Sequence, residues 1–230
     1  MPLLPRRRAL ALAGAGLLAA SGARAAGPGD RTSLTPDQAL DALTRGNARF
    51  IADPEICTSD LGSRRSAVAG HQAPWATVIA CADSRVPPEL LFGGIGLGEL
   101  FVARNAGNLA DTATIGTVEY GAAVLGSPLI VVLGHTRCGA VAAACDVVTA
   151  HATYPGAIGP MIEPIVPAAI AVRDQPGDFV DNTVRASALR TARRLGEASR
   201  LLREAVDAGS LRIVAAVYDL DSGKVAFLES

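Results

Sequence analysis

The chain has 230 residues, of which half are hydrophobic and 4% are aromatic, and its formal net charge at pH 7 is −1. This length can bury one sizeable core, so a single domain is expected. Because the net charge is near zero and the folded part has no run of basic residues, neither nucleic acid nor an anionic membrane surface is expected as a partner.

The first 25 residues have the layout of an export signal. Arg6 to Arg8 precede an apolar run over 9–20, and Ala23 to Ala25 offers a small-x-small cleavage site. The run is too short to span a bilayer, which takes about 20 residues, and adjacent arginines are typical of the twin-arginine route. We therefore expect residues 26–230 to form the mature domain of a bacterial periplasmic or secreted protein without a membrane span. A frayed amphipathic helix is the weaker alternative, because this segment has no acidic residue.

The first helix of the mature chain is expected to begin at Pro36. Thr35 can cap it, and Gln38 can complete a capping box. The spacing predicts an apolar stripe that packs on its own domain or on a partner subunit, made of Leu40, Leu43, Phe50 and Ile51.

Apolar runs further along the chain predict strands over 75–80, 100–103, 128–135 and 211–219. Between them, helices are expected over 111–125, 138–150 and roughly 181–207, with Asp111 as one cap and Gly126 and Gly209 as terminators. Ser222-Gly223 turns the chain toward an antiparallel edge strand over 224–228. Alternating strands and helices predict an α/β domain, with a mostly parallel central sheet flanked by helices and the antiparallel edge strand near the C-terminus.

Two of these strands end on loops that carry reactive side chains. The strand at 75–80 runs into Cys81, Asp83 and Arg85, and the strand at 128–135 runs into His135 and Cys138. Ligands of parallel sheets bind beyond the carboxyl ends of strands, so Cys81, His135 and Cys138 converge if the two strands are neighbours. Two thiolates and one imidazole suit zinc and leave one coordination position free.

Blander explanations exist for each residue alone, since an H-x-x-C pair arises by chance and a strand-end cysteine is often buried filler. The combination on two strands favours a metal site. A structural zinc site would need a fourth ligand, which is not found nearby, and a site made of His71, His135 and His151 is disfavoured by their scatter. Cys57 and Cys145 can form a disulfide, or Cys145 is simply a small buried residue of a helix.

Five stretches together resemble β-class carbonic anhydrases over nearly all of the mature chain: CADSRVPPE, GELFVARNAGN, GTVEYGAAVLG, VVLGHTRCGAV and VYDLDSGKVAFL. The resemblance implies a zinc lyase that reversibly hydrates carbon dioxide to bicarbonate and a proton through a zinc-bound hydroxide. It also implies a homodimer or larger homo-oligomer with active sites at the dimer interface. One zinc per subunit would be held by Cys81, His135 and Cys138, with Asp83 and Arg85 as the catalytic pair.

The resemblance also implies a substrate pocket, made of Gln72, Phe101, Ala106, Tyr120 and Gly139. From the pattern alone, Phe101 and Tyr120 would be ordinary core residues. The Arg104-Asn105 pair is expected either to orient its loop or to serve a dimer contact, and the sequence does not separate these roles.

Within such a site, Asp83 would accept a hydrogen bond from the reacting water, and Arg85 would grip that carboxylate and keep it ionised. If Arg85 released it, Asp83 could take the fourth zinc position. Members with a regulatory bicarbonate pocket resemble one another in a Trp three residues before the first Cys ligand, where this chain has Val78, so the open form is expected. The alternatives are a hydrolase of carbonyl sulfide or carbon disulfide on the same scaffold, and a non-catalytic zinc-binding or redox protein.

Overall fold

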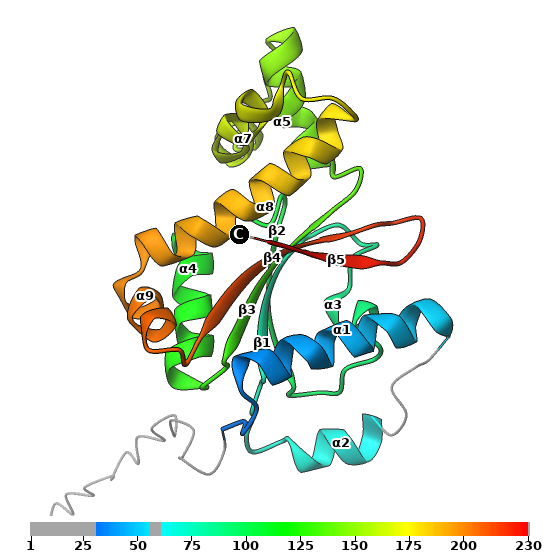
Figure 1. The fold of residues 1–230 in the computed structure, drawn as a ribbon, viewed down its shortest axis with the longest axis vertical. Helices are drawn as coiled ribbons and strands as arrows, with labels where there is room; N and C mark the ends of the chain where they lie inside the picture. The colour runs from blue at the N-terminus through cyan, green and yellow to red at the C-terminus, as the bar shows by residue number, and fades with distance from the viewer. Residues whose placement is uncertain (1–30, 56–60, 230) are drawn as a thin grey trace, which may run out of the picture.

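The structure is a computed structural model that describes residues 31–55 and 61–229 (Figure 1). Within these residues a five-stranded sheet has the order β2-β1-β3-β4-β5. Its strands are β1 (Ala76–Cys81), β2 (Leu100–Asn105), β3 (Leu129–His135), β4 (Arg212–Tyr218) and β5 (Val225–Leu228). The first four pair in parallel and β5 pairs antiparallel with β4, so the predicted fold class is confirmed.

Helices cover both faces of the sheet (Figure 1). On one face lie α1 (Pro36–Ala52) and α3 (Pro88–Leu91), with α2 (Leu61–Ala67) beyond them, and on the other lie α4 (Thr112–Glu119), α8 (Phe179–Ala198) and α9 (Arg200–Asp207). A third group packs against the first half of α8, beyond one end of the strands: α5 (Gly139–Ala150), α6 (Ile158–Ile162), a 3₁₀ turn η2 (Glu163–Ile165) and α7 (Val166–Val172).

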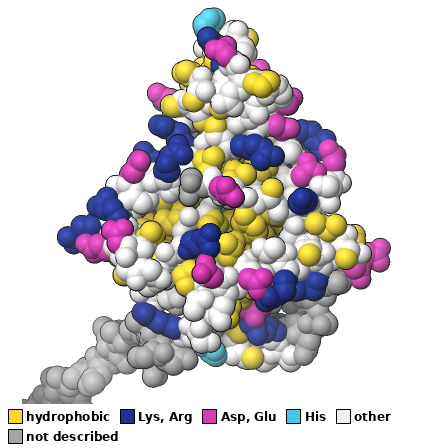
Figure 2. Space-filling view, viewed as in Figure 1, with side chains coloured by type: hydrophobic (Ala, Val, Ile, Leu, Met, Phe, Trp, Pro, Cys, Tyr) yellow, Lys and Arg dark blue, Asp and Glu magenta, His cyan; other side chains and the backbone are white. Residues whose placement is uncertain are grey.

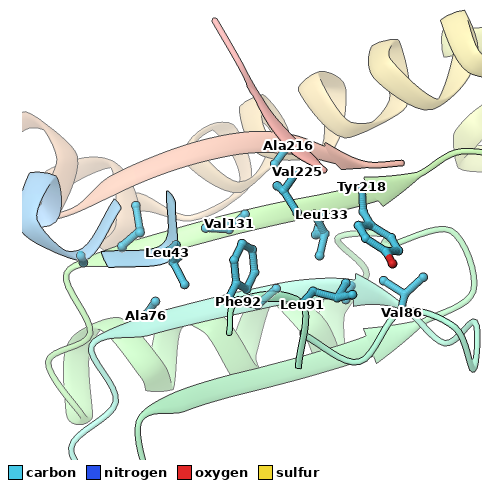
Figure 3. Packing of buried hydrophobic residues seen from close by; sticks show 14 residues of the cluster. Leu43, Ala76, Val86, Leu91, Phe92, Val131, Leu133, Ala216, Tyr218 and Val225 are labelled. Carbon is cyan, nitrogen blue, oxygen red and sulfur yellow. The ribbon is translucent and has the colours of Figure 1, made fainter. Parts of the chain in front are cut away.

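The central strand β3 is buried on both faces, as its continuous apolar run predicts. Val131 packs with Leu43 of α1 and with Phe92 in one cluster (Figure 3), whereas Ile130 and Val132 pack in a second cluster with residues of α8 and α9. The alternation of side chains along the strand therefore joins the two helical layers through one sheet.

The start of α1 follows the predicted capping box. Gln38 N donates to Thr35 Oγ1 at 3.3 Å, and Thr35 N donates to Gln38 Oε1 at 2.9 Å. The helix packs on its own domain, against α3 and β3. The prediction is wrong for one residue of the apolar stripe. Phe50 and Ile51 both lie beside the turn at Gly223, but Ile51 remains 46% exposed.

Two predicted helices are interrupted. Asp111 caps α4 as predicted, but the helix gives way to a π-helix, η1 (Tyr120–Val124), before Gly126 ends the segment with φ +76°. The helix predicted over 181–207 is two helices, because Ser199 adopts an extended backbone between α8 and α9. Its hydroxyl donates to Glu119 Oε1 at 2.5 Å and accepts from Leu202 N at 3.1 Å, so a cap restarts the chain as α9.

The export signal and the start of the mature domain at residue 26 lie outside the described residues, as does Cys57. No helix in the described ranges is long and apolar enough to cross a bilayer. On the face shown in Figure 2, charged side chains of both signs are interspersed around hydrophobic side chains in its middle part.

Two glycines provide a matched test of this packing. A Cβ on Gly46 of α1 would overlap the Phe92 carbonyl, whereas a Cβ on Gly196 of α8 would meet no atom within 4 Å. Gly46→Ala should therefore lower the free energy of unfolding by about 1–3 kcal/mol through overpacking. Gly196→Ala should raise it by up to about 1 kcal/mol through helix propensity. Urea unfolding followed by circular dichroism measures both, and equal effects of the two substitutions would contradict the close approach of α1 to Phe92.

Candidate metal centre

The metal-binding residue types converge at the carboxyl ends of β1 and β3. Cys81 is the last residue of β1, His135 is the last residue of the neighbouring β3, and Cys138 directly precedes α5. All three are buried, and their ligand atoms lie within 4.8 Å of one another. The Sγ atoms of Cys81 and Cys138 are 3.9 Å apart. The predicted convergence of these side chains is therefore present in the fold.

His135 has the hydrogen bonding of a metal ligand. Its Nδ1 lies 2.9 Å from Thr136 O, which fixes the proton on Nδ1 and leaves the lone pair on Nε2. Nε2 is fully buried and has no hydrogen-bond partner among the described residues. An unpaired buried acceptor is costly, so an electrophile in the space beside Nε2 would stabilise the site.

The two cysteine sulfurs interact directly and shift each other's pKa in opposite directions. The pKa of Cys81 is lowered, first by a hydrogen bond from Cys138 and also by the Gly107 N–H, against the opposing effect of burial. The pKa of Cys138 is raised, first because it donates to Cys81 and then because it is buried. A cation between the two sulfurs would favour the thiolate form of both, and two thiolates with one imidazole fit zinc.

Asp83 lies beside this group and is held by Arg85. Arg85 Nε and Nη2 donate to Asp83 Oδ1 and Oδ2 at 2.9 and 2.7 Å, and the Arg85 backbone N–H donates to Oδ1 at 2.9 Å. The side-chain hydrogen bonds of Arg85 hold the pKa of Asp83 well below its usual range. Asp83 Oδ2 is 3.8 Å from His135 Nε2, so an ionised carboxylate held by Arg85 faces the metal-binding atoms.

Two of the predicted pocket residues adjoin the ligands in the same chain. Ala106 precedes Gly107, whose N–H lies 3.5 Å from Cys81 Sγ, and Gly139 follows Cys138 as the first residue of α5. Gly139 is exposed at the start of this helix.

The other three lie at the opposite end of β1. Phe101 is opposite Thr77 in the sheet. Thr77 is four residues before Cys81, so Phe101 and Cys81 are separated by about 13 Å along the strand direction. Tyr120 is 48% exposed and its ring centroid is 6.0 Å from that of Phe101. Gln72 precedes β1 and is also exposed. Within one chain these residues are not brought to the metal-binding group, so their pocket role requires a second chain and stays a prediction.

Sequence reasoning missed the backbone contacts that support the site. Arg104 Nε donates to Cys81 O at 3.0 Å, and Arg104 Nη2 donates to Asp83 O at 2.5 Å. These bonds tie the end of β2 to the loop after β1. The only signal in the sequence was the Arg104-Asn105 pair within GELFVARNAGN, and the sequence did not decide the role of this pair.

The comparisons with known proteins decide the family. A family model described as carbonic anhydrase matches residues 76–225. The chain belongs to the carbonic anhydrase family. Carbonic anhydrase 2 of Mycobacterium tuberculosis is 38% identical over 192 residues, which cover 84% of this chain and 92% of the relative.

Solved structures agree with this membership of the family and assign the β class. The β-carbonic anhydrase of Coccomyxa in complex with acetazolamide is 28% identical with a TM-score of 0.62, over 82% of this chain and 84% of that one. A tetrameric β-carbonic anhydrase of Sordaria macrospora is 24% identical with a TM-score of 0.64, over 83% and 96% of the two chains, and supports the fold.

The other histidines and the third described cysteine, which the sequence allowed as ligands or disulfide partners, lie away from the metal-binding group. His71 and His151 are exposed and are not part of the metal-binding group, so the disfavoured three-histidine site is not formed. Cys145 is a free, buried thiol of α5, and its Sγ lies 3.4 Å from Thr183 Oγ1. Burial raises its pKa, which fits the interpretation of Cys145 as a packed core residue.

Zinc should stabilise the protein through His135. Addition of Zn²⁺ to chelator-treated protein is expected to raise the free energy of unfolding, by about 2.7 kcal/mol at a free concentration of one hundred times Kd. His135→Asn should lose most of this gain, because the buried Nε2 is removed. His151→Asn is the control, since His151 is exposed with φ +51°, a conformation that Asn tolerates. A thermal-shift titration that gave the same gain for His135→Asn as for wild type would remove His135 from the site.

Proposed function

We propose that this chain is a zinc-dependent carbonic anhydrase that interconverts carbon dioxide and bicarbonate, with Cys81, His135 and Cys138 as the zinc ligands. The observation that carries the proposal is the meeting of two buried sulfurs with the unpaired His135 Nε2, 3.8 Å from an ionised Asp83. Membership of the carbonic anhydrase family supports the reaction, and the donor set supports the metal.

Bound zinc would supply a Lewis acid that lowers the pKa of a water molecule from about 15.7 toward roughly 7. The residues of the chain then have separate roles. Asp83 accepts a hydrogen bond from the reacting water and directs its lone pair toward carbon dioxide. Arg85 keeps Asp83 ionised and fixes its orientation through two side-chain bonds. Cys81 and Cys138 are buried, so bulk water is excluded from the two sulfur ligands.

The reaction also releases one proton for each carbon dioxide hydrated. His71 and His151 are exposed and are not ligands, and we propose that solvent buffer takes the proton directly. The alternatives are not favoured. Storage of zinc or a redox role does not require a carboxylate gripped by Arg85 beside the metal-binding atoms, and the family comparisons favour carbon dioxide over its sulfur analogues.

We further propose a homodimer or larger homo-oligomer in which a partner completes each site. Tyr120, beside Phe101, is 48% exposed, and Gln72 is exposed at the same end of β1. The solved relative from Sordaria macrospora is described as tetrameric, which supports assembly. A second chain that presents its Gln72, Phe101 and Tyr120 to the metal-binding group would account for their distance from the ligands of their own chain.

Residues 1–25 support a proposal on location. Their arginines, short apolar run and Ala23 to Ala25 have the pattern of a twin-arginine export signal. We propose that the mature enzyme acts in the periplasm or outside the cell. Fractionation of cells that express the full chain, with Arg7 and Arg8 changed to lysine as the comparison, tests this route.

Replacement of Asp83 separates catalysis from metal binding. Asp83→Ala should retain one zinc per chain and lose carbon dioxide hydration by about 10²-fold or more, because the hydrogen-bond acceptor is removed. Cys138→Ser should lose both zinc and activity. Stopped-flow hydration assays and elemental analysis of the same samples measure the two properties.

The matched control is Asp37→Ala. Asp37 also pairs with an arginine, Arg212, at 2.7 Å, but Arg212 begins β4 at the end of the sheet away from His135. This variant should keep both zinc and activity. A fully active Asp83→Ala protein would overturn the catalytic role of Asp83.

Shared sites predict complementation between two impaired variants. Tyr120→Ala should weaken the site of its partner, and Cys138→Ser should inactivate its own. If subunits of the two variants exchange at equal amounts in a dimer, about a quarter of the sites regain a full set of residues, and activity should return toward that fraction. Each variant alone, taken through the same exchange, is the control. Sites built within one chain would give no recovery, and a monomer of full activity in analytical ultracentrifugation would exclude the shared site.

A further inference from the structure

The side chain of Asn105 closes the loop that follows β2. Asn105 Oδ1 accepts a hydrogen bond from Leu109 N at 2.7 Å, and Nδ2 donates to Leu109 O at 2.8 Å and to Thr114 Oγ1 at 3.0 Å. One amide therefore holds both ends of the segment 105–109 and ties it to α4. Both donors and one of the two acceptor lone pairs of the amide are used within the chain, so its hydrogen bonds mainly serve the loop.

The loop needs such support because its backbone adopts conformations that most residues avoid. Gly107 has φ +85° and Asn108 has φ +47°, so two consecutive residues adopt left-handed conformations. Gly107 is also closely packed: a Cβ there would lie 2.8 Å from Ile165 Cδ1. In this conformation the Gly107 N–H points at Cys81 Sγ, at 3.5 Å.

We propose that Asn105 is a positioning residue of the metal centre, which holds the Gly107 N–H against the Cys81 sulfur. The proposal rests on the function proposed above. A backbone N–H that donates to a thiolate ligand draws electron density from the sulfur and fixes the direction of its lone pairs. Asn105 touches neither metal nor substrate, and it acts through Gly107 alone. Arg104 has the complementary role on the other loop, where it holds the carbonyls of Cys81 and Asp83.

The test compares two asparagines with the same number of hydrogen bonds. Asn47 is buried and also makes three, from its Nδ2 to Leu91 O and Gly223 O and from Val225 N to its Oδ1, but it ties α1 to the β4–β5 turn. Asn105→Asp and Asn47→Asp each replace two donors by acceptors, so both should lower the melting temperature. Only Asn105→Asp should weaken zinc binding, by about 10–100-fold in a chelator competition assay.

The Co²⁺-substituted proteins supply a readout of the sulfur itself. Loss of the N–H donor raises the energy of the sulfur lone pairs, so the sulfur-to-cobalt charge-transfer band of Asn105→Asp should move to lower energy than in wild type. The band of Asn47→Asp should not move. If Asn105→Asp does not fold, Thr114→Val, which removes one of the three bonds, should shift the band in the same direction by a smaller amount.

The outcomes distinguish this inference from the proposed function. Wild-type protein that binds one zinc per chain and hydrates carbon dioxide establishes the function independently of Asn105. If it does so, and Asn105→Asp keeps the zinc affinity and the band of wild type, the positioning role is wrong and the function stands. Equal changes in the two Asp variants would also overturn the role, since they would report loss of stability. Wild-type protein without a metal site would overturn both.

Discussion

Two buried sulfurs 3.9 Å apart set the constraint on which this molecule depends. The two sulfurs shift each other's pKa in opposite directions, and the neighbouring imidazole keeps an unpaired nitrogen. Burial of these groups is unfavourable by itself, because like charges repel and desolvated polar atoms lose their hydrogen bonds to water. A single divalent cation would relieve all of these costs together, so the metal and the local fold should stabilise each other.

The sheet delivers the ligands to this point through the pairing of β1 with β3. Ala80 lies opposite Leu133, so the two strands end at the same edge, with Cys81 on one and His135 on the other. This register depends on apolar side chains of β3 that pack into both helical layers, and a shift by one residue would turn each of them to the opposite face. The chemistry of the site is therefore supported by the core that lies beneath it.

These features could be predicted because their signals are local. The continuous apolar run of β3, the capping box of α1 and the cap at Asp111 each depend on residues within a few positions of one another. The break at Ser199 has a local part, the cap on Leu202 N, but its hydroxyl also bonds Glu119 from 80 residues away, which the sequence does not show. The segment over 158–172 was also missed, because its helices are short and interrupted by Pro160, Pro164 and Pro167, so the helical period is never sustained.

The candidate site also has parts that the sequence predicts and parts that it does not. The residue types at strand ends can be read directly from the sequence. Once the strands were placed, these side chains could be grouped: Cys81, Asp83, His135 and Cys138. The Gly107 N–H belongs to the backbone, and its direction depends on φ angles that cannot be read from the sequence. If the Gly107 N–H tunes the Cys81 sulfur as proposed, the site depends on residues such as Asn105 that are not metal ligands. The importance of such residues follows from hydrogen bonds that only the folded structure shows. The sequence therefore pointed to the Arg104-Asn105 pair but did not reveal its role.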